Sequence, residues 1–165
     1  MNEMLAFMKE KHKYSGFTLI ELLVVLAVIG ILAAVVSVNV WRGRQNSRDA
    51  RRVSDIKQVQ NALSLYADEC GGYPLVGVDL DISGLGLDDT CGGWVSSPTG
   101  SKIYIYAVPP AMQPAEPGCL DPNPPNSNTY FYLGTDTTYS INFCLGSKVG
   151  DFVPGPHVAD QDGIL

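Results

Sequence analysis

The sequence is poor in charge and in histidine. Asp, Glu, Lys and Arg together make up 17% of its 165 residues, 45% of the residues are hydrophobic, and histidine occurs only 2 times. A chain of this composition is too apolar and too weakly charged to be intrinsically disordered. Its formal net charge of −6 also excludes a generally basic nucleic-acid-binding protein.

Motifs of the common enzyme classes are missing as well. No serine stands in a nucleophile elbow, and no glycine-rich pattern follows a strand to hold phosphate. No Cys-x-x-Cys pair occurs, and neither His12 nor His157 lies near a pair of cysteines, which argues against a zinc site. We therefore expect a protein that is not an enzyme and that needs no cofactor.

The sequence does contain one long apolar run near its N-terminus. Fifteen consecutive apolar residues, 22–36, lie within a 25-residue stretch, 17–41, that has four polar members. At about 1.5 Å per residue, a helix of this length crosses a hydrocarbon core of roughly 30 Å. A short polar leader, 1–16, precedes it. Three interpretations are open: a cleaved secretory signal, an ordinary membrane anchor, or a leader that is cut on the polar side of the run.

Glu21 helps to separate these interpretations because it lies inside the apolar stretch. An acidic residue at the centre of a membrane helix costs about 2.5–3.5 kcal/mol, and less near a helix end. Its carboxylate either reaches back to the headgroups or needs a partner. Cleavage between Gly16 and Phe17 would supply one, because it creates a free α-amino group on Phe17. Glu21 of one subunit would then neutralise the amine of a neighbour, which couples processing to assembly.

The segment 16–22, Gly-Phe-Thr-Leu-Ile-Glu-Leu, between a basic leader and an apolar helix, resembles the N-terminal signature of type IV pilins and their pseudopilin relatives. The resemblance implies that a prepilin peptidase cuts after Gly16 and methylates the amine of Phe17. It also implies that Glu21 is the assembly residue.

The resemblance covers about residues 9–74, since the segment 55–74 is also similar to the helix end of major pseudopilins and many pilins. Gly30 matches a glycine where the helix of many pilins loosens in the filament. Val38 stands where many members have proline, so the residue that breaks the helix in those members is missing here.

The residues after Trp41 predict an amphipathic continuation of the helix. Apolar residues recur every three or four positions, and Gly71-Gly72 followed by Pro74 ends the pattern. A continuous helix over 17–70 would measure roughly 80 Å, so its outer half must pack on something, and its apolar stripe suits a sheet. The stripe consists of Val53, Ile56, Val59, Leu63 and Tyr66.

The charges of the chain are unevenly divided. Residues 42–57 carry a net charge of +4, and residues 58–165 carry −10. The basic block could bind lipid headgroups or nucleic acid, but we favour a solvated helix face or ion pairing between subunits. Counted alone, these arginines would place the C-terminus in the cytoplasm. The block contains Arg42, Arg44, Arg48, Arg51, Arg52 and Lys57.

The four cysteines argue for the opposite orientation. Cys70, Cys91, Cys119 and Cys144 lie in or beside a Pro- and Gly-rich region typical of secreted folds. Three pairings are possible, and buried free thiols are an alternative. We favour the pairing of neighbours, Cys70–Cys91 and Cys119–Cys144, because each closes a local loop that can contribute about 3 kcal/mol. Disulfides require an oxidising compartment, so the C-terminal part is expected outside the cytoplasm.

Short, aromatic-rich segments predict strands at 102–108, 129–133 and 138–145, the last two joined as a hairpin. Seven of the eleven prolines lie in 109–125, which predicts a loop. The expected fold class is therefore α+β: a long N-terminal helix with a membrane-spanning and an amphipathic half, packed on a small antiparallel β-sheet head. The tyrosines of these segments are expected to pack in the core rather than to stack on bases or sugars.

The resemblance to major pseudopilins also implies a calcium site in a C-terminal loop. Asp160 and Asp162 are the weak candidates, and solvated loop acids are the favoured alternative, so no metal is expected. Further acids that could contribute are Asp79, Asp81, Asp88 and Asp89.

Together these features predict a leader (1–16), an apolar assembly helix (17–41), an amphipathic helix (42–70) and a disulfide-bonded head (71–165). The resemblance implies a type IV pilus subunit for adhesion, motility or DNA uptake. It would be a single-pass precursor in the cytoplasmic (inner) membrane, with its C-terminus outside, and then part of an extracellular filament. Implied partners are a prepilin peptidase, identical or related subunits in a helical homopolymer, a membrane assembly platform, and the lipid bilayer before assembly. The alternatives are a type II secretion pseudopilin and a membrane-anchored extracellular binding module.

Overall fold

The computed structural model describes residues 16–125 and 127–165. By its internal contacts the chain forms two units, which divide between Val40 and Trp41. The described elements are α1 (Leu19–Cys70), β1 (Val76–Asp81), β2 (Leu87–Asp88), β3 (Ile103–Ile105), β4 (Phe131–Gly134), β5 (Tyr139–Leu145), β6 (Gly155–Asp160) and β7 (Gly163–Ile164).

Helix α1 runs without interruption through Gly30 and ends where the glycines predicted. Gly71 has a φ of 81°, in the left-handed region that glycine adopts without steric cost. Its N–H donates to the Ala67 carbonyl at 2.8 Å, so it caps the last turn. The helix begins at Leu19 rather than at the expected Phe17.

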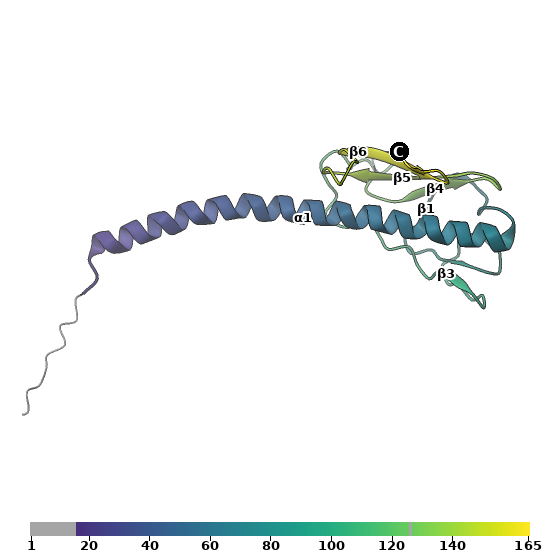
Figure 1. The fold of residues 1–165 in the computed structure, drawn as a ribbon, viewed down its shortest axis with the longest axis horizontal. Helices are drawn as coiled ribbons and strands as arrows, with labels where there is room; N and C mark the ends of the chain where they lie inside the picture. The colour runs from purple at the N-terminus through teal and green to yellow at the C-terminus, as the bar shows by residue number, and fades with distance from the viewer. Residues whose placement is uncertain (1–15, 126) are drawn as a thin grey trace, which may run out of the picture. The chain divides into compact units, whose positions relative to one another are not determined.

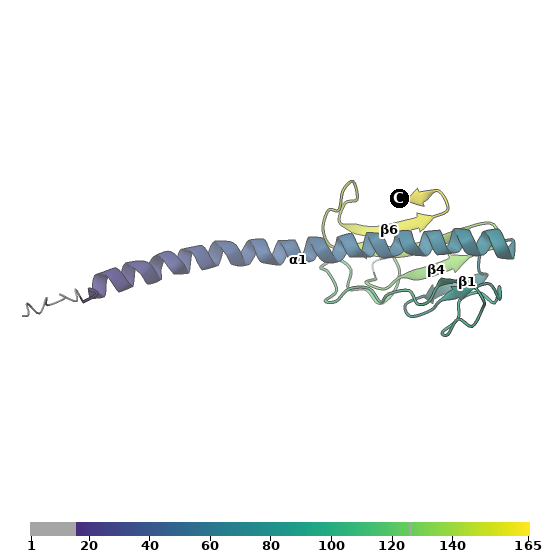
Figure 2. The same cartoon turned by 60° about the horizontal axis from the view of Figure 1, so that its bottom comes forward.

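The head contains a five-stranded antiparallel sheet in the order β1-β4-β5-β6-β7, and a separate pair, β2-β3. The sheet and β3 lie along opposite sides of α1 (Figure 1). A turned view shows β1 and β6 on either side of the helix axis (Figure 2). The predicted hairpin is confirmed: β4 pairs with β5, and Gly134 faces Tyr139 across the turn.

The apolar stripe of α1 packs against this sheet. Ile56, Val59 and Leu63 are completely buried, together with Ile141 and Phe143 on β5. Full burial of such a side chain contributes about 1.5–3 kcal/mol, so these contacts stabilise the head. The structure confirms the α+β class, with the helix packed on an antiparallel sheet. The expectation that the tyrosines of the strand segments pack in the core is wrong for Tyr106, which is 69% exposed. The tyrosines that do pack in the core are Tyr66, Tyr130, Tyr132 and Tyr139.

Several strands differ from the sequence expectations. The strand expected over 102–108 is only three residues long, because β3 pairs only with the two-residue β2. The segment expected at 129–133 begins later, at Phe131. β1 and β6 were not predicted, since at least half of each sequence, VGVDLD and GPHVAD, consists of Gly, Pro, Ala or Asp, which are depleted in strands. Pairing with β4 and β5 makes them strands.

Candidate processing and assembly motif

The N-terminal part of α1 has an apolar surface without a covering layer. Among the described residues, α1 is the one helix that is long and apolar enough to cross a membrane. Every side chain from 19 to 36 is exposed. No described residue of the first unit covers these side chains, and an apolar surface of this size is stable in contact with lipid or with other chains.

Thr18 and Glu21 form a capping box at the start of α1. The Thr18 N–H and hydroxyl donate to Glu21 Oε2 at 3.1 and 3.0 Å, and the Glu21 N–H donates to Thr18 Oγ1 at 3.3 Å. Such a box satisfies two N–H groups that the first helical turn leaves without partners. Both Thr18 contacts use the same carboxylate oxygen. Within the described residues, Glu21 Oε1 has no hydrogen-bond partner.

The expected cleavage site lies just outside the helix. Gly16, Phe17 and Thr18 have no regular secondary structure, and all three are exposed. An exposed irregular segment is accessible to a protease without unfolding. The predicted leader, apart from Gly16, lies outside the described residues, as do Lys9, Lys11 and Lys13.

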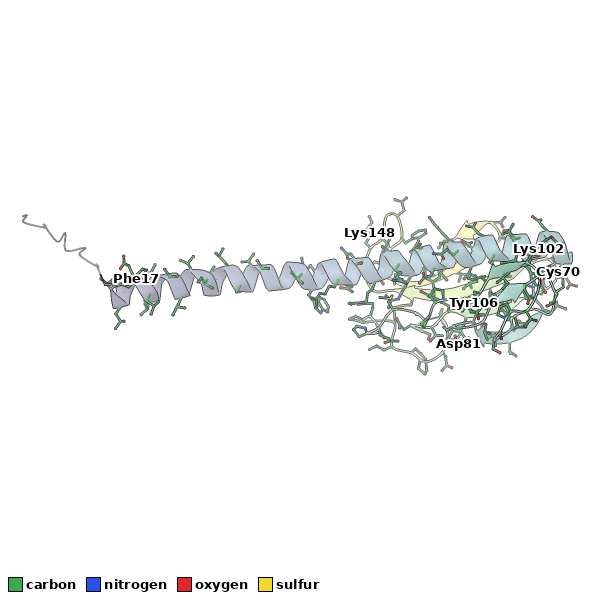
Figure 3. All side chains as sticks on the ribbon, turned by 90° about the horizontal axis from the view of Figure 1, so that it is seen from below. Phe17, Cys70, Asp81, Lys102, Tyr106 and Lys148 are labelled. Atoms are coloured by element: carbon green, nitrogen blue, oxygen red, sulfur yellow. A yellow bond between two sulfur atoms is a disulfide. The ribbon has the colours of Figure 1, made fainter. Side chains whose placement is uncertain are left out.

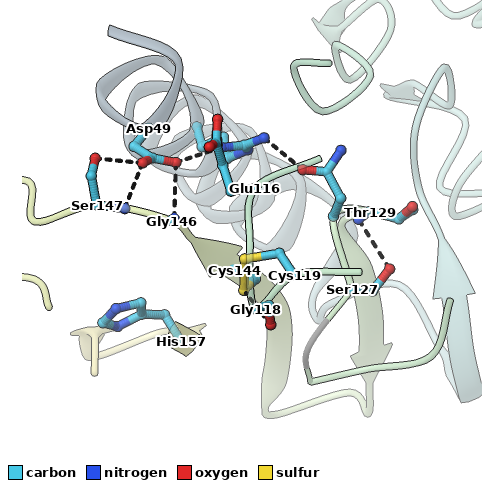
Figure 4. Close-up of a disulfide and its surroundings, with 12 residues drawn as sticks. Asp49, Glu116, Gly118, Cys119, Ser127, Thr129, Cys144, Gly146, Ser147 and His157 are labelled. Atoms are coloured by element: carbon cyan, nitrogen blue, oxygen red, sulfur yellow. Dashed lines mark hydrogen bonds and ion pairs between the residues drawn. A yellow bond between two sulfur atoms is a disulfide. The ribbon is translucent and has the colours of Figure 1, made fainter. Parts of the chain in front are cut away.

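Part of the basic block forms a buried ion cluster in the head. Arg52 and Asp49 are both completely buried and form an ion pair one turn apart on α1. The Arg48 Nε–H donates to Glu116 Oε1 at 2.6 Å. The Arg52 guanidinium lies 3.8 Å from the same oxygen. Glu116 belongs to the proline-rich segment, so the cluster attaches this segment to the helix (Figure 4).

Neutral groups complete the coordination of the cluster. Asp49 Oδ2 accepts hydrogen bonds from the Ser147 N–H at 2.8 Å and from its hydroxyl at 2.6 Å. Arg52 Nη2 donates to the Met112 carbonyl at 2.7 Å and to Asn128 Oδ1 at 2.5 Å. The cluster therefore connects α1 with three later segments of the chain. Buried charges are tolerated only when they are paired and hydrogen-bonded in this way.

The expectation that Arg48 and Arg52 lie on a solvated face or pair between subunits is wrong. Their partners include Glu116, which is more than sixty residues away in sequence, so helical periodicity could not indicate the pairing. Arg42, Arg44, Arg51 and Lys57 are exposed, as expected.

The cysteines form two disulfides between sequence neighbours. Cys70–Cys91 joins the end of α1 to the loop before β3, and Cys119–Cys144 joins the proline-rich segment to β5. Cys119 and Cys144 are each 1% exposed, whereas Cys91 is solvent-exposed. The second disulfide and Glu116 both hold the same proline-rich segment, which has no strand of its own.

The candidate calcium ligands do not converge. Asp160 Oδ1 accepts the N–H groups of Asp162 and Gly163 at 2.8 and 3.1 Å, and so shapes the β6–β7 turn. Asp81 Oδ1 accepts the Ser83 N–H at 2.9 Å, and Asp79 lies on β1. Over the described residues, no three His, Cys, Asp or Glu side chains gather as a metal site.

Asp88 has a structural role that corrects the expectation of a solvated acid. It is buried and accepts hydrogen bonds from the backbone N–H groups of Thr99 and Gly100, at 2.8 and 2.9 Å, and from Thr90. These bonds, above all that of the Thr90 hydroxyl, lower the pKa of Asp88 to about 2. Asp88 thus organises the loop that carries Cys91. Asp89, its neighbour, is half-buried.

Sequence reasoning did not identify Thr18, Asp49 or Glu116 as members of these sites. For Thr18 a signal was available, because Thr-x-x-Glu before an apolar run is the sequence signature of a capping box. For Asp49 and Glu116 no local pattern exists, because their partners come from distant segments.

Comparisons with known proteins identify the same N-terminal motif. The family model described as the prokaryotic N-terminal methylation motif matches residues 11–37, which include Gly16, Phe17 and Glu21. The chain is similar to the type II secretion system core protein G of Vibrio cholerae, with 29% identity over 143 residues, 85% of each chain. It is also similar to that of Klebsiella pneumoniae, with 26% identity over 138 residues, 82% of this chain and 95% of the relative.

The chain carries the N-terminal methylation motif and is similar over most of its length to proteins of type II secretion systems. A higher identity, 38% over 72 residues, is found with the core protein G of Aeromonas hydrophila. That match covers 44% of this chain and spans half the length of the relative. No solved structure matches the chain.

The matched motif implies processing by a prepilin peptidase and assembly with related subunits, and it fits a membrane-anchored precursor. The relatives are named as secretion-system components, and none of these names denotes a catalytic activity. The names also favour the pseudopilin alternative over a type IV pilus subunit, which was the first interpretation of the sequence.

Proposed function

We propose that this chain is a pseudopilin of a type II secretion system. Residues 17–41 hold the precursor in the cytoplasmic membrane, a prepilin peptidase cuts after Gly16 and methylates Phe17, and the processed chains polymerise into a filament. The main support is the apolar surface of residues 19–36, which is exposed and begins with one carboxylate, Glu21, in the matched motif.

Glu21 can both cap its own helix and bind a neighbour. Thr18 occupies Oε2, which leaves Oε1 to accept a hydrogen bond from the Phe17 amine of another subunit. Cleavage between Gly16 and Phe17 does not touch the Thr18 amide, so the capping box survives processing. The methylated amine keeps its positive charge and its ability to donate. In an apolar filament core, this ion pair is favourable because each unpaired charge would be costly.

The head supplies a rigid outer surface for the filament. The buried ion cluster and Cys119–Cys144 attach the proline-rich segment to α1 and β5, and Cys70–Cys91 fixes the end of the helix. Both disulfides require formation outside the cytoplasm. This is consistent with a head that folds after its N-terminal segment is inserted and before assembly begins.

Three variants of the full-length chain, expressed with the secretion machinery, separate charge from capping. Glu21→Gln keeps a hydrogen-bond acceptor for Thr18 but removes the charge, so we expect processing to continue and assembly to stop. Thr18→Ala removes the cap but keeps the charge, so we expect assembly to persist. Glu21→Ala removes both functions. The measurements are the mass of the N-terminal peptide and the amount of filament sheared from the cells.

Chains that still begin with Met1 in every fraction would contradict the processing step. Normal filament yield from Glu21→Gln would contradict the charge role. If Thr18→Ala were as defective as Glu21→Ala, the carboxylate would act mainly through its cap.

A type IV pilus subunit is the second candidate, favoured by a head with two disulfides. Abundant sheared protein starting at methylated Phe17, together with normal protein secretion after deletion of the gene, would support the pilus. Processed protein confined to membranes, together with a secretion defect, would support the pseudopilin.

A further inference from the structure

A cleft of about 340 Å³ opens at the end of the head where α1 terminates. Its walls include Tyr66, Tyr73, Leu75, Asp136 and the Cys70–Cys91 disulfide, and we refer to it as the tyrosine cleft. Figure 3 shows Cys70 and Lys102 at this end of the head, with Lys148 toward the other end. We propose that the tyrosine cleft binds the segment Trp41-Arg42-Gly43-Arg44 of a second copy of this chain.

The surroundings of the cleft are electronegative. The C-terminus of a helix carries a partial negative charge, which basic residues in the last turn normally offset. α1 has no basic residue there, and it carries Asp68 and Glu69 instead. Lys102 compensates Glu69 through an ion pair of 2.7 Å. Asp68 and Asp136 are exposed and form no ion pair with any described residue.

The walls of the cleft are mixed, and polar groups form the larger share of their accessible surface. Two tyrosine rings and a disulfide form part of its wall, and Leu75 at its edge is 69% exposed. Tyr66 is buried, so the half-buried Tyr73 is the ring that an arginine side chain can contact through a cation–π interaction. The matching ligand therefore combines cationic groups with a flat or apolar body.

The start of the head helix offers this chemistry. Trp41 is 58% exposed, and Arg42 and Arg44 beside it are exposed and form no ion pair within the described part of the chain. This distinguishes them from Arg48 and Arg52, whose charges are neutralised inside the head. Trp and Arg are also the residues most often found to dominate protein–protein interfaces.

The segment 41–44 cannot reach the tyrosine cleft of its own chain. The segment 41–44 and the cleft residue Tyr66 belong to the same helix, about 35 Å apart along its axis. The contact must therefore join two copies, the start of one head helix against the end of another. Such a head-to-tail contact uses two different surfaces, so its repetition adds copies and generates a filament when it does not close into a ring. The inference rests on the proposed assembly function and specifies one contact within it.

Charge reversal in the full-length chain tests the contact. Asp136→Arg is expected to lower the yield of sheared filament at least about tenfold, because it places like charges opposite each other. Arg44→Glu in the same chain is expected to restore assembly. Asp151→Arg, an exposed acid outside the cleft, serves as the matched control. An N-terminal peptide beginning at Phe17 and two intact disulfides establish that each variant is processed and folded.

A photo-crosslinking side chain at Leu75 identifies the neighbour directly. The expected product contains two copies of this chain, joined through a peptide that includes Trp41, and it disappears in Glu21→Ala. The same probe at Leu120, exposed but outside the cleft, should give no such peptide. Filaments that form while Leu75 links to another protein or another segment would overturn this contact alone. Absence of wild-type filaments from both sheared and membrane fractions would instead contradict the proposed function.

Discussion

The two parts of helix α1 differ in the exposure of their apolar side chains. From Leu19 to Val36, every side chain is exposed, and a capping box lies at the start of the helix. From Trp41 to Cys70, the apolar stripe is buried against the sheet, and Arg52 is buried with its partners. The helix thus contains one segment whose apolar stripe is covered by the head and one segment whose side chains are exposed within its own unit.

This difference shows where the stability of each part comes from. Long helices in water depend mainly on tertiary packing of an amphipathic face, and the head supplies that packing for residues 41–70. For residues 19–36 the packing must come from lipid or from other subunits. Substitutions in the head should therefore change folding, whereas substitutions in the apolar segment should change insertion or assembly.

The largest expected effect comes from the buried ion cluster. Arg52→Met should lower the free energy of unfolding of the head by about 3–5 kcal/mol, because Asp49 and Glu116 lose a cation in a buried site. Arg51→Met removes an exposed neighbour and should change it by no more than about 0.5 kcal/mol. Urea unfolding of the purified chain in detergent, followed by tryptophan fluorescence, measures both. Equal midpoints for the two variants would contradict the role of the cluster.

Two leucine-to-alanine variants, one in each part of the helix, test whether only the second part contributes to the stability of the head. Leu63→Ala creates a cavity in the core and should cost about 2–5 kcal/mol of head stability. Leu32→Ala removes the same atoms from an exposed position of the first unit and should leave the unfolding of the head unchanged. The same denaturation experiment applies. A destabilised head in Leu32→Ala would mean that the two parts are not energetically separate.

The two disulfides should differ in reactivity although each contributes about 3 kcal/mol in the chain-entropy model. In the Cys70–Cys91 disulfide, Cys91 is solvent-exposed, whereas Cys119 and Cys144 are both buried. A water-soluble reductant should therefore reduce Cys70–Cys91 first in the native chain. Alkylation of the released thiols over time, followed by peptide mass spectrometry, gives the order. Simultaneous reduction under native conditions would show that burial does not protect the second disulfide.

Because of Asp88, the free energy of unfolding of the head should decrease at low pH. Hydrogen bonds from Thr90 and Gly100 lower its pKa to about 2, compared with about 3.9 in an unfolded chain. The folded state therefore binds its proton less tightly, so the stabilisation is complete above about pH 4 and is lost as the pH falls toward 2. Asp88→Asn should lower the urea midpoint at pH 7, and its difference from the wild type should shrink below pH 4. Asp151→Asn is the exposed control, and a pH-independent difference for Asp88→Asn would contradict the charge role.

Features that depend on local pattern can be predicted from the amino-acid sequence. The apolar run, the stripe of Val53, Ile56 and Val59, and the turn between β4 and β5 follow from periodicity and turn residues. Their counterparts in the structure are the exposed first part of α1, the packed second part and the hairpin. The motif at 16–22 was visible for the same reason, since its residues are adjacent in the chain.

Features that depend on distant partners are visible only in the folded chain. Arg52 belongs to a basic block, yet it is buried, because Glu116 and Asn128 from later segments reach it. β6 is a strand although it begins with Gly-Pro, because β5 presents an edge to pair with. In both cases the free energy comes from contacts between residues far apart in sequence, which no local pattern records.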